Sequence, residues 1–215
     1  MKINFLLVAL VAFSTTLSAQ DWSADVYKFG EQYPGYIITD TGVKIEGFIK
    51  YRDPVSMQED VMFFAEKGNR KSKVKYKTAD LKEYKVADKL YHCIHYSGGL
   101  MKKPVRANLV VNEGCITEYV WYAKVEGFAL LTRGTNESIE DYYKRCYDST
   151  MVFKKQNEEE VKALSSFGIK FAPKMAEYVA DNKELAQKVK GKEKGYKALG
   201  ILNIIAEYNA ACTPK

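Results

Sequence analysis

Apolar and polar side chains alternate along residues 43–51, and this pattern constrains the fold more than any other feature of the chain. Valine, isoleucine, glycine and tyrosine take every second position there, and lysine, glutamate and phenylalanine take the positions between them. A period of two is the period of a β-strand. An earlier apolar segment, 36–39, is separated from it by residues 40–42, and Gly42 can take the left-handed conformation of a three-residue hairpin loop. The two segments therefore predict a β-hairpin.

Strand signals of the same kind recur along much of the chain. Further strands are predicted at 61–65, 73–77, 90–96, 105–111, 116–124, 128–132 and 151–155, with a break at Asp53-Pro54 and a polar loop at 134–141. Short turns separate most of these segments, and short turns join strands that are antiparallel. The 16 tyrosines agree with this, since tyrosine favours half-buried strand positions. We therefore expect an antiparallel β meander, as an open sheet or as a partly closed barrel.

After the last predicted strand, the spacing of apolar residues becomes helical. Pro173 suits the first turn of one helix, and Asp181 or Asn182 can cap a second. A third helix carries an apolar stripe that we expect to be buried. The stripe consists of Ile201, Ile204, Ile205, Tyr208 and Cys212. We thus predict an α+β protein with a β-rich domain at 20–156 and a helical subdomain at 157–215 that packs on it.

The first residues have the layout of a secretory signal peptide. Lys2 gives a positive start, 5–13 is an apolar run, and Leu17-Ser18-Ala19 ends in a small residue. We expect residues 1–19 to be removed and the protein to be exported, to a periplasmic, outer-membrane-associated or extracellular location. Gln20 stands where a bacterial lipoprotein carries its lipidated cysteine, so no lipid anchor is expected. No later segment approaches the ~20 apolar residues of a membrane-spanning helix.

Four cysteines follow the predicted signal peptide: Cys93, Cys115, Cys146 and Cys212. In an oxidising compartment an even number of cysteines permits two disulfides, in any of three pairings. Free buried thiols are the alternative, since a domain of this size can fold without disulfides. No Cys-x-x-Cys spacing occurs, so the usual pattern of a structural zinc site or a thioredoxin-like redox site is missing.

The segment 92–95 holds both histidines of the chain beside a cysteine. On a strand, Cys93 and His95 point to the same side and could supply two ligands to a soft metal. The sequence nominates no third or fourth ligand, so we expect ordinary strand positions and neither a metal nor another cofactor. A nucleophilic Cys-His pair is the catalytic alternative, although neighbours on one strand do not guarantee the hydrogen bond that activates the thiol.

A run of alternating lysines is the first candidate surface for a partner or ligand. Lys73, Lys75 and Lys77 alternate with Val74 and Tyr76, so a strand here shows lysines to water. Such lysines suit an acidic polymer. They are also a common device against edge-to-edge aggregation, which we take as the better interpretation.

An aromatic cluster is the second candidate surface. Tyr119 and Trp121 lie close to Tyr122 in the predicted meander and could form a stacking platform for sugar rings. Core or cross-strand packing is the commoner role of such a cluster. Tyr119 and Trp121 are therefore candidate ligand contacts with a structural alternative.

The predicted hairpin also carries a resemblance to known proteins. The segments that carry it are Tyr36-Ile37-Ile38-Thr39, Gly42, Lys44-Ile45-Glu46-Gly47-Phe48-Ile49-Lys50-Tyr51, Lys75-Tyr76, Ala79-Asp80-Leu81, Lys85-Val86, Glu177-Tyr178 and 181–185. Together with the Ala19-Gln20 junction, they resemble small secreted, functionally uncharacterised proteins common in Bacteroidota. The resemblance implies a β-rich exported domain with helical C-terminal elements, and it brings no catalytic motif.

These features favour binding over catalysis. The net charge of +6 is dispersed, unlike the basic stripe of a nucleic-acid-binding protein, and paired catalytic groups are not evident. We expect an exported, non-enzymatic cell-envelope protein that acts in protein–protein interaction or assembly. A module that binds a glycan or anionic polymer is the alternative, and a hydrolase with a folded-together carboxylate or Cys-His site is a third. Assembly requires an exposed apolar surface, whereas ligand binding requires a concave aromatic or basic site.

Overall fold

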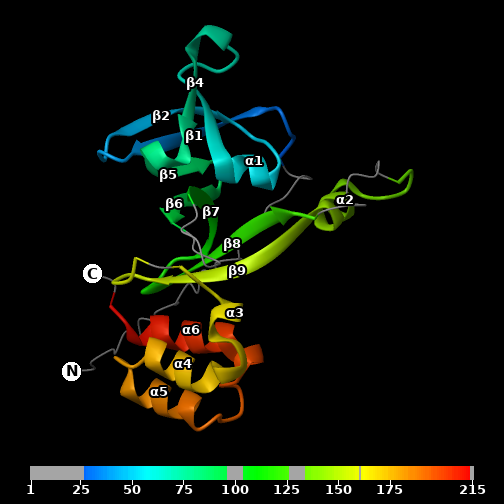
Figure 1. Cartoon of the computed structure of the whole chain (residues 1–215). Coiled ribbons are helices and arrows are strands. Elements are labelled where there is room, and N and C mark those ends of the chain that lie inside the picture. The colour runs from blue at the N-terminus through cyan, green and yellow to red at the C-terminus, as the bar shows by residue number, and fades with distance from the viewer. Residues whose placement is uncertain (1–26, 96–103, 126–133, 160, 214–215) are drawn as a thin grey trace, which may run out of the picture.

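Ten antiparallel strands form one open sheet in the computed structural model, which describes residues 27–95, 104–125, 134–159 and 161–213 (Figure 1). The strands are β1 (Gln32–Thr39), β2 (Lys44–Lys50), β3 (Asp60–Phe64), β4 (Lys73–Lys77), β5 (Leu81–Val86), β6 (Lys89–His95), β7 (Val105–Asn112), β8 (Ile116–Lys124), β9 (Tyr147–Lys155) and β10 (Lys162–Ala163). Their order across the sheet is β10-β9-β8-β7-β6-β5-β1-β2-β3-β4. The α+β class and the antiparallel meander are therefore confirmed, and the sheet is open rather than closed into a barrel.

Helices lie between the strands and after them. The α-helices of the described residues are α1 (Pro54–Glu59), α2 (Ile139–Cys146), α3 (Leu164–Phe167), α4 (Phe171–Tyr178), α5 (Lys183–Lys190) and α6 (Ile201–Ala211). Short 3-10 turns occur at Arg70–Ser72, Thr78–Asp80, Gly168–Lys170 and Ala198–Gly200. None of the helices in these described stretches has the length and apolar character needed to cross a membrane.

The sheet consists of two meanders joined at β1. The predicted hairpin is confirmed as β1 and β2, and Gly42 in its loop has a φ of +90°. β3 and β4 continue from β2, and the chain then returns so that β5 pairs with the other edge of β1. From β5 to β10 each strand pairs with the next one along the chain. This return could not be read from the alternation pattern, because pairing of β5 with β1 depends on contacts between distant segments.

Two helices occupy segments that the sequence did not predict as helical. The predicted break at Asp53-Pro54 is the start of α1: Asp53 accepts a hydrogen bond from the Ser56 N–H at 3.0 Å, and Pro54 takes the first helical position. The predicted loop at 134–141 contains the start of α2. The strand predicted at 151–155 begins four residues earlier in β9, and the strand predicted at 128–132 lies outside the described residues.

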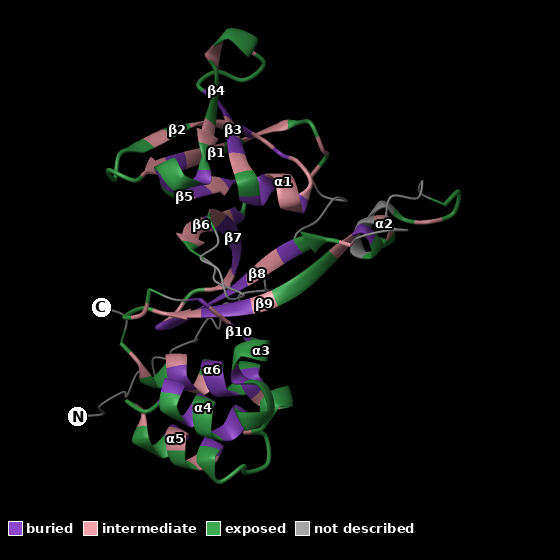
Figure 2. Ribbon diagram, in the orientation of Figure 1, coloured by how far each residue is buried: buried purple, intermediate pink, exposed green. Residues whose placement is uncertain are grey.

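A first core packs α1 against the sheet, and Figure 2 colours parts of α1 and of the neighbouring strands as buried. Its buried residues are Ile37, Ile49, Tyr51, Met57, Val61, Phe63, Leu81, Tyr84, Val86, Tyr91, Ala107, Leu109 and Tyr122. Tyr84 and Tyr91 stack with ring centroids 4.6 Å apart. The Tyr84 hydroxyl of β5 donates a hydrogen bond to the Met57 carbonyl of α1 at 2.6 Å, and this contact connects α1 to the sheet.

A second core joins the C-terminal helices to β8 and β9. Helices α3 to α6 lie below these strands in Figure 1, and their buried side chains pack on Ile116 and Phe153. The predicted burial of the α6 stripe is confirmed for Ile201, Ile204, Ile205 and Tyr208. Cys212, at the end of this stripe, forms a disulfide with Cys115, whereas Cys93 and Cys146 are not disulfide-bonded.

Candidate functional site

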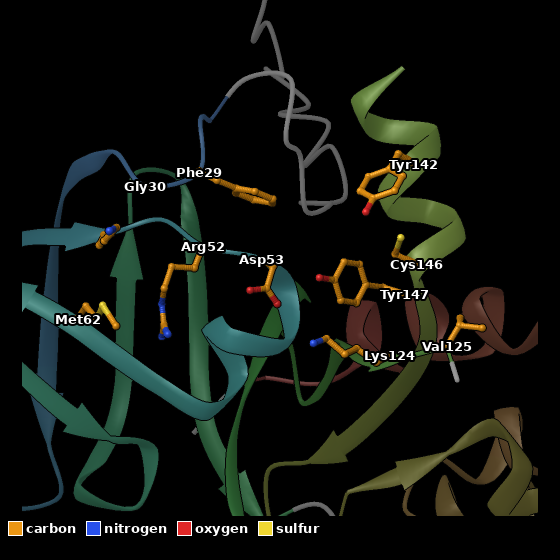
Figure 3. Close-up of a pocket in the computed structure, with 11 residues that line it drawn as sticks. Phe29, Gly30, Arg52, Asp53, Met62, Lys124, Val125, Tyr142, Cys146 and Tyr147 are labelled. Carbon is orange, nitrogen blue, oxygen red and sulfur yellow. The ribbon is translucent and has the colours of Figure 1, made fainter. Parts of the chain in front are cut away.

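A cavity of about 600 Å³ opens where α1, α2 and the end of β8 meet (Figure 3). It is lined by Phe29, Gly30, Lys50, Arg52, Asp53, Met62, Lys124, Val125, Tyr142, Cys146 and Tyr147. The volume falls within the range of ordinary small-molecule sites, about 300–1,000 Å³. We refer to this cavity as the basic pocket, because three of its lining side chains are cationic.

One wall of the pocket, formed by Arg52 and Asp53 just before α1, is held in place through Gln58 of that helix. The Gln58 amide donates from Nε2 to the Tyr122 carbonyl at 2.7 Å and accepts from the Tyr122 N–H at 2.6 Å. Gln58 is 2 % exposed, so both hydrogen bonds are shielded from water. Because Tyr122 lies two residues before Lys124, this contact fixes α1 relative to the end of β8 that lines the pocket.

Arg52 is a structural cation of this wall. Its Nη2 donates to the Ser56 carbonyl at 2.8 Å, to the Asp60 carbonyl and to Asp60 Oδ1 at 2.7 Å. Asp60 Oδ2 also pairs with Lys75 at 2.9 Å. The Arg52 guanidinium is therefore committed to the protein, although its buried Nε has no hydrogen-bond partner among the described residues.

Lys50 and Lys124 are the cations of the pocket that remain available. Lys50 ends β2 and Lys124 ends β8, so they come from opposite meanders of the sheet. Neither makes an ion pair or a side-chain hydrogen bond within the part of the chain that the structure describes. Asp53 contributes one carboxylate, and its Oδ1 accepts the N-terminal hydrogen bond of α1. The pocket therefore carries an excess of positive charge.

Aromatic rings form the opposite wall. Figure 3 shows Phe29, Tyr142 and Tyr147 directed toward the space beside Asp53. Tyr142 lies on α2, and a hydrogen bond with the Cys146 thiol raises the pKa of its hydroxyl. A tyrosine presents both an apolar ring and a hydroxyl, which suits contact with a sugar ring.

The position of α2 follows from local hydrogen bonds. Ser138 Oγ accepts from the Asp141 N–H at 3.0 Å and donates to Asp141 Oδ2 at 2.8 Å, which caps the helix. Arg145 holds Glu137 with two hydrogen bonds of 2.9 Å each. The Ser138-x-x-Asp141 spacing is the sequence signal that could have identified this helix.

The basic pocket is equipped to hold an anionic group. Asp53 is the single carboxylate among the lining residues that the structure describes. Most glycoside hydrolases use two carboxylates that flank the scissile bond. The geometry therefore offers two free ammonium groups and aromatic contacts, and it does not bring together a hydrolytic pair from these lining residues.

A second, more polar cluster surrounds His92, whose side chain lies on the face of β6 opposite to that of its neighbour Tyr91 in the first core. His92 Nδ1 lies 3.0 Å from the Tyr119 hydroxyl, and Nε2 lies 3.9 Å from a carboxylate oxygen of Glu83 and of Glu113. Burial lowers the pKa of His92, and the two carboxylates oppose this effect. A cavity of about 500 Å³ adjoins the cluster, and Lys154 lines it as well. Its mixture of charges selects no single class of ligand.

Cys93 and His95, the candidate ligands of a metal or Cys-His site, are not joined by further ligands among the described residues. Cys93 packs against the first core, and burial raises the pKa of its thiol to about 12, so the thiolate is scarce at neutral pH. His95 is exposed at the end of β6. The described residues contain no group of three or more histidine, cysteine or acidic side chains that could hold a metal ion.

The predicted surface residues lie apart from the basic pocket. Lys73, Lys75 and Lys77 lie on β4, at one edge of the sheet. Tyr119 is 3 % exposed and contacts His92, so its ring is covered rather than open for stacking. Trp121 is half-buried and packs against a small cluster around Val152.

Comparisons with protein-family models, with curated proteins and with solved structures found no match to this chain. The resemblance to small secreted Bacteroidota proteins therefore stays a prediction.

Proposed function

We propose that this protein is an exported binding module that holds an acidic glycan in the basic pocket. The observation that carries the proposal is the convergence of Lys50 and Lys124, two ammonium groups without ion-pair partners among the described residues, on one aromatic-walled cavity. An anionic ligand in this cavity would supply a counter-charge to both lysines, neither of which has an ion-pair partner among the described residues. Export rests on the predicted signal peptide.

The lining of the pocket supports a sugar acid over a simple ion. Phe29, Tyr142 and Tyr147 provide ring surface that an inorganic anion would not use. Lysine ammonium groups recognise carboxylate or sulfate as point charges, and aromatic rings offer an apolar face to a sugar ring. The volume of about 600 Å³ accommodates a short oligosaccharide rather than an isolated ion.

Titration with an acidic oligosaccharide tests the proposal. We suggest oligogalacturonate and its carboxyl-reduced, neutral counterpart as probes, measured by calorimetry on the mature protein. The acidic probe should bind, and replacing both pocket lysines (Lys50→Gln with Lys124→Gln) should weaken binding about tenfold or more. Equal binding of the acidic and neutral probes, or full affinity in the double variant, contradicts the proposal.

A charge-matched variant serves as the control. Lys82 and Lys190 are exposed lysines outside the pocket, and Lys82→Gln with Lys190→Gln removes the same formal charge. Binding through the pocket predicts that this variant keeps the wild-type affinity. Binding through overall positive charge predicts that both double variants weaken alike.

Assembly with a protein partner is the second candidate function. Exposed apolar side chains of the C-terminal helical part favour it: Leu164, Ile169, Leu199 and Leu202. Ile169 and Leu199 are fully exposed. If these side chains bind an envelope protein, Ile169→Ser with Leu199→Ser should remove a stoichiometric partner from pull-downs while leaving the melting temperature unchanged. Retention of the partner in that variant would count against assembly through this surface.

A further inference from the structure

The outer edge of β4 is an accessible strand edge, separate from the basic pocket. β4 is the terminal strand of the sheet, and within the described residues no strand pairs with its outer edge. All of its residues except Tyr76 are exposed (Figure 2). The opposite edge is β10, which is only two residues long. An exposed strand edge presents backbone N–H and C=O groups that another strand can pair with.

One face of this edge is basic. Lys73, Lys75 and Lys77 occupy alternate positions of β4, so their side chains lie on the same face of the sheet. Lys75 pairs with Asp60 at 2.9 Å. Lys73 and Lys77 make no ion pair with any described residue. Positive charge on this face therefore lacks compensation at both ends of the strand.

The other face of the edge is apolar. Tyr76 packs its ring edge-on against Phe63, with centroids 6.0 Å apart, and so continues the first core. Val74 lies on the same face of the sheet and is 45 % exposed. An added strand would therefore meet lysines on one face and an uncovered valine on the other.

The charge pattern decides which strand fits. If two copies of β4 paired antiparallel with their apolar faces continuous, lysine would lie opposite lysine, and like charges in that position are destabilising. The edge is thus protected against self-association. A strand with acidic residues at alternate positions would instead place a carboxylate opposite each lysine, which is attractive. The lysines therefore disfavour pairing with a second β4 and favour pairing with an acidic strand.

We propose that the outer edge of β4 binds an extended acidic segment of a partner protein by strand addition. Acidic residues of that segment lie opposite Lys73, Lys75 and Lys77, and apolar residues between them cover Val74. Backbone hydrogen bonds hold the segment, and the alternation of charge sets its register.

Fluorescence anisotropy with short labelled peptides tests this proposal on the mature protein. The probe is an acetylated, amidated peptide in which glutamate alternates with valine, and the reference is a peptide of the same composition with its glutamates grouped together. Strand addition predicts that the alternating peptide binds about tenfold tighter or more. Equal affinity of the two peptides would mean simple charge attraction and would overturn the proposal.

N-methylated peptides separate backbone pairing from charge. Backbone N–H groups of a strand point alternately to its two edges, so methylating one alternate set blocks pairing with β4 and methylating the other set does not. One N-methylated peptide should therefore lose binding and the other should keep it. Equal behaviour of the two N-methylated peptides contradicts strand addition.

Two protein variants locate the site. Lys73→Gln with Lys77→Gln should weaken binding of the alternating peptide. The melting temperature of this variant should stay at the wild-type value, because both side chains are exposed. Lys50→Gln with Lys124→Gln should leave peptide binding unchanged. The reverse pattern would place the peptide in the basic pocket and overturn the assignment to β4.

Discussion

Gln58 on α1 takes the place of a neighbouring strand for Tyr122 on β8, 64 residues away. Its amide exchanges hydrogen bonds of 2.7 and 2.6 Å with both backbone groups of that residue. β7 pairs with β8 only at 118–120, so Gln58 continues the hydrogen bonding of this edge beyond the C-terminal end of the paired stretch. Beyond its N-terminal end, Asn209 of α6 exchanges hydrogen bonds of 2.8 and 2.9 Å with the backbone of Ile116. Two helices thus complete one edge of β8.

Replacement of Gln58 should destabilise the protein. Gln58→Ala leaves a buried N–H and a buried C=O of Tyr122 without partners, and each such group costs about 1–3 kcal/mol. We expect the free energy of unfolding to fall by about 2–5 kcal/mol in a denaturant titration. Gln187→Ala on α5 is the control, since Gln187 is exposed, and it should stay within about 0.5 kcal/mol of wild type. Equal stability of the two variants would contradict this role of Gln58.

The disulfide between Cys115 and Cys212 should contribute to stability. It closes a loop with a sequence separation of 97 residues, and cross-links of that length restrict the unfolded chain. We expect Cys115→Ser with Cys212→Ser to lower the free energy of unfolding by about 2–5 kcal/mol. Reductant should lower the melting temperature of a Cys93→Ala, Cys146→Ala variant in the same way. If reductant leaves the melting temperature of that variant unchanged, the disulfide does not contribute to stability.

Ile205 should behave as a core residue of the helical part. It is 0 % exposed and lies in the second core with Ile204 and Tyr208. Ile205→Ala should lower the free energy of unfolding by about 2–5 kcal/mol, the usual range for emptying a core position. Leu202 on the same helix is 46 % exposed, and Leu202→Ala should cost much less. If the two alanine variants unfold at the same denaturant concentration, the docking of α6 described above is wrong.

Acid should weaken the attachment of the helices to β9. Asp181 accepts hydrogen bonds from Lys155 at 2.8 Å and from the Tyr208 hydroxyl at 2.6 Å. Burial acts to raise the pKa of Asp181, but these hydrogen bonds outweigh it, so the folded-state pKa lies below the ordinary 3.8. A depressed carboxylate pKa stabilises the fold above the ordinary pKa, and this contribution is lost as the pH falls through the folded-state pKa.

The Asp181→Asn variant measures that contribution. The variant cannot titrate at this position, so its melting temperature should lie below that of wild type near neutral pH. We expect the difference to shrink as the pH is lowered from about 6 to about 3. A difference that stays constant across this range would assign the stability to something other than ionised Asp181.

Local patterns predicted most of the strands and the C-terminal helices, but they missed β5, α1 and α2 and did not give the arrangement of the strands. The hairpin of β1 and β2 and the buried stripe of α6 follow from periodicity within one segment, and both are confirmed. The pairing of β5 with β1 depends on contacts between distant segments, which periodicity does not encode. α1 was missed because Asp53-Pro54 reads equally as a strand break and as a helix start.

The candidate site was less predictable than the fold. Lys50 and Lys124 each stand at the end of a strand, where a lysine is ordinarily a solvated residue. Their proximity to one cavity arises only when β8 extends past its pairing with β7 and α1 fills the space beside it. By contrast, the lysines of β4 lie within one strand, so their alternation was visible in the sequence.

The most direct measurement of the proposed function is a lysine-resolved titration. Reductive methylation with ¹³C-formaldehyde keeps the charge of each lysine and gives it an NMR signal, which Lys→Arg variants assign one position at a time. On addition of oligogalacturonate, we predict saturable shifts of the signals of Lys50 and Lys124, with those of Lys82 and Lys190 unchanged. If the signals of Lys50 and Lys124 do not shift, or if the signals of all four lysines shift alike, binding of the acidic glycan in the basic pocket is contradicted.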